Sequence, residues 1–252
     1  MRLLVCAATG NELAALAPPS LAAIATHLES EAFCSPSSVP LAPEGIFASR
    51  VQVYLALTGV GPVNAALALG HALAMLQARD ALPRLVINIG LAGAYDLREN
   101  PLRSLCLVRE EIWPEYGLHD GASVTAEAFS WPLWTRPGEQ GGTVYDRLPL
   151  SGMESLGDTR VSDTCFSPCR SLTVAGVTAS INRSRDLQGR YHAQLENMEG
   201  FAVAYACARC GIPCLEIRSV SNKVGPRAKH EKDFPGALDA LGRIMPLLRL
   251  TR

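Results

Sequence analysis

Three polar residues of this 252-residue sequence stand where apolar runs end or helical patterns begin. Glu12 follows the apolar run 2–8, Glu199 opens a helical pattern, and Asn222 follows the apolar run 214–220. Ionised carboxylates accept hydrogen bonds from hydroxyl groups and stabilise positive charge, whereas an amide both donates and accepts. A carboxylate can also take a proton from water. Brought together by the fold, these residues could bind a polar ligand and activate water.

The apolar pattern predicts strands that alternate with helices. Apolar or β-branched runs between Gly, Pro and Ser predict strands over 2–8, 51–57, 85–89, 105–108, 172–177 and 214–220. Apolar residues three and four apart predict helices over 12–16 with a continuation at 21–28, then from 62, over 198–210 and over 234–248, and 35–45 reads as a loop. Residues 182–191 read as a polar helix or a loop. This alternation indicates an α/β, three-layer αβα fold with a mostly parallel, twisted central sheet flanked by helices.

The predicted strand ends carry the residues that could form a site. In open α/β sheets, ligands bind beyond the carboxyl ends of the strands. The turns after five predicted strands contain Thr9, Thr58, Gly90, Thr178 and Ser221. We therefore expect these turns to converge around one cleft.

Length and charge limit the classes of function. We expect one domain over 1–252, with a flexible insertion at about 131–171, where Gly and Pro are frequent and apolar periodicity fades. The net charge of −1 and the lack of a Lys/Arg run argue against nucleic acid and membrane surfaces as partners. The apolar runs are too short for a bilayer span or a signal peptide. We therefore expect a cytoplasmic protein.

Eight cysteines raise the question of a metal site. Cys207, Cys210 and Cys214 follow the spacing C-x2-C-x3-C, but Cys214 falls in the next predicted strand. No His lies close in sequence to complete a ligand set. Buried or loop thiols in a reducing compartment explain these residues better. We expect neither a metal ion nor an organic cofactor.

Three segments resemble a known family: 88–95 (NIGLAGAY), 196–200 (ENMEG) and 218–222 (RSVSN). They are similar to the nucleoside phosphorylase/nucleosidase superfamily and, within it, to the futalosine hydrolases. The resemblance covers most of the chain outside 131–171. It implies a phosphorylase-like mixed sheet and cleavage of futalosine by water to hypoxanthine and dehypoxanthinyl futalosine, in menaquinone biosynthesis. It also implies a small nucleoside as substrate and a homo-oligomer, with a dimer as the first expectation.

The resemblance assigns catalytic roles to the two glutamates. Glu199 matches the glutamate that binds the ribose hydroxyls, and Glu12 matches the glutamate that activates water. Breaking an N-glycosidic bond makes the sugar cation-like, as in glycoside hydrolysis, so a carboxylate beside the ribose is stabilising. Met198 is carried over as a side chain that packs against the ribose, although ordinary core packing explains it about as well.

Asn222 is the residue that discriminates between purines. Adenine-specific relatives have Asp at this position, which can accept from the exocyclic amine and deliver a proton to N7. Asparagine can donate to a 6-oxo group and accept from a protonated N7, but it cannot act as an acid. Asn222 therefore favours hypoxanthine or guanine, and the purine must obtain its proton elsewhere, with water as the first candidate.

Further substrate-binding residues are expected on the same segments. Gly93 and Asn197 belong to the matching segments, Arg218 is expected to brace either the loop or Glu199, and Ser221 is expected to orient Asn222. Ser180 stands where adenine-cleaving relatives place an aromatic residue. The group that recognises the benzoate end of futalosine stays open, with His119, Arg98 and Arg227 as candidates that the sequence does not rank.

Several alternatives remain. Within the superfamily, the chain could be a methylthioadenosine/S-adenosylhomocysteine-type nucleosidase or a 6-oxopurine nucleoside phosphorylase. The sequence after the first strand, 7–12 (AATGNE), lacks the arginine that related phosphorylases use for phosphate. A non-catalytic nucleoside-binding module would not need both Glu12 and Glu199. The turn 59–61 faintly resembles a dinucleotide-binding loop but lacks its third glycine.

Overall fold

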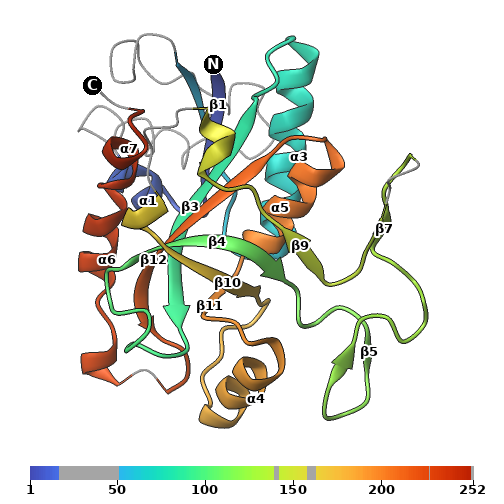
Figure 1. The fold of residues 1–252 in the computed structure, drawn as a ribbon, viewed down its shortest axis with the longest axis vertical. Helices are drawn as coiled ribbons and strands as arrows, with labels where there is room; N and C mark the ends of the chain where they lie inside the picture. Colours follow the sequence, from blue (N-terminus) through green and yellow to red (C-terminus); the bar gives the residue numbers. More distant parts are fainter. Residues whose placement is uncertain (17–50, 139–141, 158–162, 227, 251–252) are drawn as a thin grey trace.

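The computed structural model describes residues 1–16, 51–138, 142–157, 163–226 and 228–250. Figure 1 shows a twisted central sheet with helices on both faces. In the described residues this sheet has eight strands in the order β11-β10-β4-β12-β3-β1-β2, with β9 paired to β4. The strands are β1 (Arg2–Ala7), β2 (Gln52–Leu57), β3 (Leu85–Ala94), β4 (Leu105–Ile112), β9 (Arg147–Pro149), β10 (Ser167–Thr173), β11 (Leu195–Asn197) and β12 (Cys214–Lys223).

The sheet is mixed. Strand β1 pairs in parallel with β2 and β3, β12 with β3, and β10 with β4 and β11. Strand β4 runs antiparallel to both β12 and β9, and β11 runs antiparallel to the end of β3. The predicted three-layer architecture with a mostly parallel sheet is confirmed.

Several strands differ from their predicted bounds. Strand β3 continues through the glycine-rich segment that was predicted as a turn, because glycines here admit neighbouring side chains against the sheet. A Cβ atom on Gly90 would lie 2.4 Å from Nη1 of Arg218. The strand predicted over 172–177 is instead β10, Ser167–Thr173, and its polar first half is held by pairing with β4.

Two helical layers enclose the sheet (Figure 1). On one face lie α1 (Gly10–Ala15), α6 (Phe234–Leu241) and α7 (Ile244–Leu247), and on the other lie α3 (Pro62–Ala78) and α5 (Gly200–Arg209). Each layer has its own core of buried apolar side chains against the sheet. Helix α4 (Ile181–Tyr191) follows the loop after β10, so the predicted polar segment is helical.

Two helix predictions need correction. The closing helix over 234–248 is divided, because α6 ends at Leu241 and α7 begins at Ile244. Helix α5 begins at Gly200 rather than 198, and Glu199 is its N-cap. Pro62 does open α3, as predicted. The predictions over 21–28 and 35–45 fall outside the described residues.

The segment 131–171 contains several short elements among its described residues. The strands β7 (Trp134–Thr135) and β8 (Thr143–Val144) form a hairpin, and β5 (Leu118–His119) and β6 (Val124–Thr125) form another before this segment. Strand β9 and the start of β10 join the central sheet. Figure 1 shows both hairpins projecting from the side of the molecule that carries α5.

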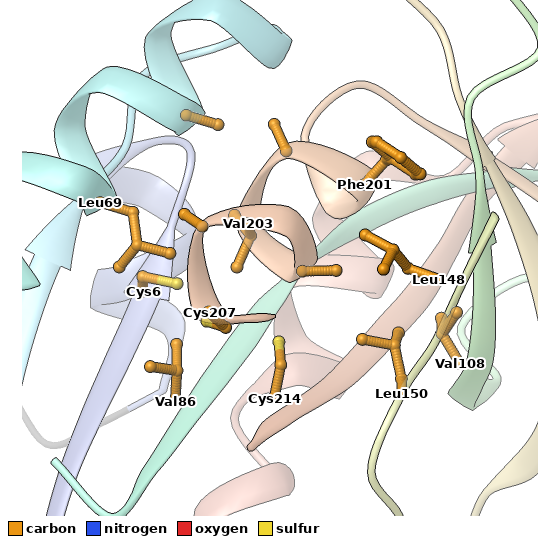
Figure 2. Close-up of a cluster of buried hydrophobic side chains, with 14 of the residues drawn as sticks. Cys6, Leu69, Val86, Val108, Leu148, Leu150, Phe201, Val203, Cys207 and Cys214 are labelled. Carbon is orange, nitrogen blue, oxygen red and sulfur yellow. The ribbon is translucent and has the colours of Figure 1, made fainter. Parts of the chain in front are cut away.

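The cysteines of the described core are packing residues. Figure 2 shows Cys6, Cys207 and Cys214 among Leu69, Val203 and other apolar side chains. In the part of the chain that the structure describes, no group of three or more His, Cys, Asp or Glu could hold a metal ion. None of the described helices is both long and apolar enough to cross a bilayer.

Candidate active site

A cleft of about 200 Å³ opens beyond the carboxyl ends of β1 and β11 and beside the last residues of β3 and β12. Seven of the nine predicted site residues line it: Glu12, Gly93, Asn197, Met198, Glu199, Ser221 and Asn222. The residues come from distant parts of the sequence, so their meeting follows from the sheet order. Of the five turn residues expected to converge, Thr9 and Ser221 line the cleft, whereas Thr58, Gly90 and Thr178 do not. Gly90 and Ser221 lie inside β3 and β12 rather than in turns.

Glu12 is held rigidly at the start of α1. Its Oε2 accepts hydrogen bonds from the backbone N–H of Thr9 (3.0 Å) and from the Thr9 hydroxyl (2.9 Å). Its Oε1 accepts from the backbone N–H of Leu91 at 2.9 Å. A carboxylate has about four lone-pair positions, and three are occupied. The remaining position, on Oε1, is available to a water molecule.

Glu199 stands at the N-terminus of α5, with 6 % of its surface exposed. Its Oε1 accepts from the backbone N–H of Gly61 at 3.0 Å, so the glycine turn at 59–61 positions this carboxylate. Its Oε2 lies 3.7 Å from Nη1 of Arg218. Burial raises the pKa of Glu199, while Arg218 and the Gly61 N–H act in the opposite direction. Both oxygens retain lone pairs for ligand hydroxyls.

Asn197 sets the backbone of this helix start. Its Oδ1 accepts from the N–H groups of Glu199 (2.9 Å) and Gly200 (2.7 Å), which the Glu199 side chain does not cap. Helix N-termini have free N–H groups, and a side-chain oxygen that accepts from them fixes the geometry. Met198, between Asn197 and Glu199, is half-buried and borders the cleft.

Asn222 reaches the cleft because β12 contains a bulge. The register of β12 on β3 shifts between Val220 and Asn222, so that Ser221 and Asn222 both line the cleft. The Asn222 Oδ1 accepts from the Ser221 hydroxyl at 2.9 Å, and its Nδ2 donates to the Lys223 carbonyl at 2.8 Å. One lone pair and one N–H stay free. Gly93 makes room, since a Cβ atom there would lie 3.1 Å from Nδ2.

Two predicted residues do not line the cleft. Arg218 is 1 % exposed and lies behind it, where Nε donates to Glu216 at 2.9 Å and Nη1 faces Glu199. It lies beside Glu199, as expected of a bracing residue, but its close hydrogen bond is to Glu216. Ser180 is exposed and caps α4 by accepting from the Arg183 N–H at 3.2 Å. A serine before a helical segment is a normal cap. The prediction followed instead the likeness of Ser180 to an aromatic position in relatives.

Other residues of the cleft were missed. Glu196 borders the cleft and accepts from the Thr178 N–H (2.9 Å) and hydroxyl (2.6 Å), which fixes the loop that carries Val177 to the site. Val60 and Phe234 form part of the wall and are 50 % and 42 % exposed. Large apolar side chains at a strand end and at a helix start were the available signal.

Comparisons with known proteins identify the family of this chain. The family model described as "Phosphorylase superfamily" matches residues 4–244. A futalosine hydrolase of Thermus thermophilus is 34 % identical over 191 residues, 76 % of this chain and 78 % of that protein. A futalosine hydrolase of Streptomyces coelicolor is 34 % identical over 200 residues, 77 % of this chain and 79 % of that protein.

Solved structures show the same fold at lower identity. A futalosine hydrolase mutant of Helicobacter pylori superposes with a TM-score of 0.67 at 18 % identity, covering 98 % of both chains. A 5'-methylthioadenosine/S-adenosylhomocysteine nucleosidase of the same organism also gives 0.67 at 18 %, covering 98 % of this chain and 97 % of the other. This chain therefore belongs to the phosphorylase superfamily and, within it, to the futalosine hydrolase family.

Proposed function

We propose that this protein hydrolyses futalosine to hypoxanthine and dehypoxanthinyl futalosine, as a step of menaquinone biosynthesis. The observation that carries the proposal is the single cleft lined by Glu12, Glu199 and Asn222. Relatives that are 34 % identical are named futalosine hydrolases, which supports the choice of substrate.

The two glutamates act on different reactants: Glu199 on the sugar and Glu12 on the water. Glu199 accepts hydrogen bonds from the ribose hydroxyls through the lone pairs that Gly61 and Arg218 leave open. Its negative charge stabilises the cation-like sugar as the N-glycosidic bond breaks. Glu12 holds a water molecule at its free lone pair and accepts a proton as the water oxygen bonds to the anomeric carbon.

Asn222 reads the leaving base. Its free N–H donates to the 6-oxo group of hypoxanthine, and its free lone pair accepts from the protonated N7. The electron pair of the broken bond stays on the purine, and a second water gives a proton to N7. The hydroxide that remains takes up the proton that Glu12 accepted, so that one water is consumed overall. Ser221 and the Lys223 carbonyl hold the amide in the orientation that this pattern requires.

The open side of the cleft suits the remainder of futalosine. Val60 and Phe234 present exposed apolar surface there, which fits an aromatic substituent on the sugar. Of the three residues considered for the benzoate group, Arg98 and His119 do not line this cleft, and Arg227 lies outside the described residues.

Water is favoured over phosphate as the nucleophile. Among the described residues that line the cleft there is no Arg or Lys, whereas Glu12, Glu196 and Glu199 present carboxyl groups. A phosphate site needs several hydrogen-bond donors, and nearby carboxylates repel the phosphate. A phosphorylase reaction is therefore the weaker alternative.

A substrate panel tests the proposal. Purified protein is incubated with futalosine, its 6-amino analogue, inosine and methylthioadenosine, with and without phosphate, and the free base is measured. We expect hypoxanthine from futalosine at a rate that phosphate does not change. Phosphate dependence would indicate a phosphorylase, preference for the 6-amino compounds an adenine-type nucleosidase, and binding without base release a non-catalytic module.

We also infer a homodimer. One face of α3 and α5 forms an apolar groove of about 510 Å³ with Trp113 and Leu133, and Val63 and Leu67 are 78 % and 62 % exposed there. Apolar patches of this kind commonly mark protein–protein contacts. The groove adjoins the turn that carries Gly61, so a second copy would pack beside the catalytic cleft.

We place the protein in the cytoplasm. All seven cysteines of the described residues are free thiols, five of them buried. Free thiols persist in reducing compartments. Fractionation of the native host, with the chain followed by antibody, tests this location.

A further inference from the structure

A buried pair of carboxyl groups lies directly behind the cleft. Glu111 on β4 and Glu216 on β12 are both 0 % exposed, and neither lines the cleft. The two groups meet under the first residue of α5. A Cβ atom on Gly200 would lie 2.3 Å from Oε1 of Glu111 and 2.7 Å from Oε1 of Glu216. Buried charges are costly unless they are paired, so this arrangement needs an explanation.

Glu111 is connected to the backbone of Glu199. Its Oε1 accepts from Nδ2 of Asn197 at 2.6 Å, and Asn197 in turn accepts from the Glu199 and Gly200 N–H groups. Its Oε2 accepts from the Thr173 hydroxyl at 2.7 Å. All of these donors are neutral, which suits an uncharged acid.

Glu216 is connected to the side chain of Glu199. It accepts from Nε of Arg218 at 2.9 Å and from Nδ2 of Asn88 at 3.0 Å. The same guanidinium lies 3.7 Å from Glu199, beyond direct hydrogen-bond distance. Arg218 is therefore bound to Glu216 and, through Nη2, to Oδ1 of Asn197 at 3.4 Å, and is only near Glu199. A cationic donor at close range suits an ionised carboxylate.

One proton accounts for both environments. Burial, the charge of Glu216 and a hydrogen bond to Glu216 hold the pKa of Glu111 well above its ordinary value. The other charged or titratable groups that interact with this pair are Arg218, Glu199 and the thiols of Cys6, Cys169 and Cys214. Hydrogen bonds to neighbouring thiols and burial raise the pKa values of Cys169 and Cys214, and burial raises that of Cys6. The neutral donors around Glu111 and the cation bound to Glu216 agree with the raised pKa of Glu111 and place the proton on this residue.

We propose that the Glu111–Glu216 pair is a positioning device for Glu199, in which Glu111 fixes the helix start through Asn197 and Glu216 keeps Arg218 from neutralising the Glu199 carboxylate. The inference rests on the proposed function, since it matters only if Glu199 must stay negatively charged toward the ribose. Without the Glu216 charge, Arg218 would turn to its remaining close carboxylate and compete with the ligand hydroxyls.

Two isosteric variants separate this device from ordinary core packing. Glu111→Gln keeps the Glu216 charge but replaces one accepting oxygen of Glu111 by a donor, and we expect kcat to fall less than in Glu216→Gln, with the acid limb of the pH profile unchanged. Glu216→Gln removes the charge that holds Arg218, and we expect kcat to fall about 10- to 100-fold, as for a misplaced catalytic group. The acid limb of its pH profile moves to lower pH, because Glu199 is closer to Arg218 and loses the nearby Glu216 charge.

A crystal structure of each variant and an infrared spectrum give readouts that do not need turnover. We expect the Glu199–Arg218 separation to shorten in Glu216→Gln and to stay unchanged in Glu111→Gln. We also expect wild type at neutral pH to show the band of a buried protonated carboxyl group, which Glu111→Gln lacks. If wild type releases no base but both readouts hold, the proposed function fails and the charge arrangement stands.

The inference is overturned by any of three results. Equal loss of activity in both variants with an unchanged pH profile would mean that the pair is only part of the packed interior. An unchanged Glu199–Arg218 separation in Glu216→Gln would remove the role of Glu216. Absence of the infrared band would show that the two groups share no proton.

Discussion

At the scale of single residues, the cleft side chains are fixed but not saturated. Glu12 accepts three hydrogen bonds, Glu199 one, and Asn222 donates one and accepts one. Each keeps a free donor or acceptor position. Fixed groups with unused capacity are what preorganised catalysis requires, since little reorganisation is needed when charge develops.

Substitution Asn222→Asp tests base recognition. A carboxylate cannot donate to the 6-oxo group, so we expect hypoxanthine release to fall by on the order of 100-fold or more, with a gain on the 6-amino analogue. The measurement is kcat/KM on both substrates. The control is Ser180→Ala, which removes an exposed helix cap away from the cleft and leaves the preference unchanged. Unaltered preference in Asn222→Asp would mean that the base is read elsewhere.

Substitution Glu111→Gln changes how stability depends on pH. The raised pKa of Glu111 in the folded protein means that its contribution is fully present below about 4.5, its ordinary value, and is lost as pH rises toward the folded pKa. The free energy of unfolding of wild type relative to Glu111→Gln should therefore decline by up to ~1.4 kcal/mol per pH unit in that window. Urea unfolding at about pH 5, 6 and 7 measures this decline in the free energy of unfolding. A constant difference would contradict the assignment of the proton to Glu111.

At the scale of elements, short chain irregularities place the functional groups. The bulge in β12 turns Asn222 to the cleft, the Thr9–Glu12 capping box fixes Glu12, and the Gly61 turn holds Glu199. Each irregularity is a local backbone feature that positions one functional side chain. We therefore expect small shifts in these elements to affect activity more than stability.

A pair of glycine substitutions tests the packing at the start of α5. Gly200→Ala would push a methyl group against both buried carboxyl groups, and we expect a loss of about 1–3 kcal/mol together with reduced activity. Gly70 occupies an exposed position of α3, and nothing lies within 4 Å of a Cβ atom added there, so Gly70→Ala should instead stabilise the protein by about 0.5–1 kcal/mol. Denaturant unfolding compares them. Equal effects would show that Gly200 has no special role.

Element types were more predictable than their bounds. Apolar runs identified the buried strands, whereas the polar and Gly-containing segments led to wrong strand bounds. Strand β3 runs on past Ile89 because Gly90 admits Arg218, and the first half of β10 is polar because pairing with β4 holds it. The Glu111–Glu216 pair was not predictable, since Glu111 follows Arg109 and Glu110 beyond the predicted strand, and the sequence does not show which residues meet across the sheet.

At the scale of the whole molecule, the sheet order makes the site. Strand β12 lies between β4 and β3, and β11 returns to the end of β3, so residues far apart in sequence share one cleft. Seven of the nine predicted site residues line this cleft because strand ends meet in such a sheet. Ser180 does not, because it caps α4 at the surface, and Arg218 does not, because it is buried behind the cleft.

The apolar groove on α3 and α5 predicts a dimer. Leu67→Glu places a charge on its exposed surface, and we expect it to weaken association, whereas wild type should run near twice 26.9 kDa. Light scattering after size exclusion measures the mass. The control is Ile181→Glu on α4, which is 41 % exposed and outside the groove. A monomeric wild type would contradict the dimer.

The most direct test of the central claim compares binding and turnover in Glu12→Gln. The amide preserves the shape of the Glu12 side chain but cannot accept a proton from water. We expect calorimetry to show futalosine bound about as tightly as by wild type, while hypoxanthine release falls about 10²- to 10⁴-fold. Release within a few-fold of wild type would contradict the account, because water would then be activated by a group other than Glu12.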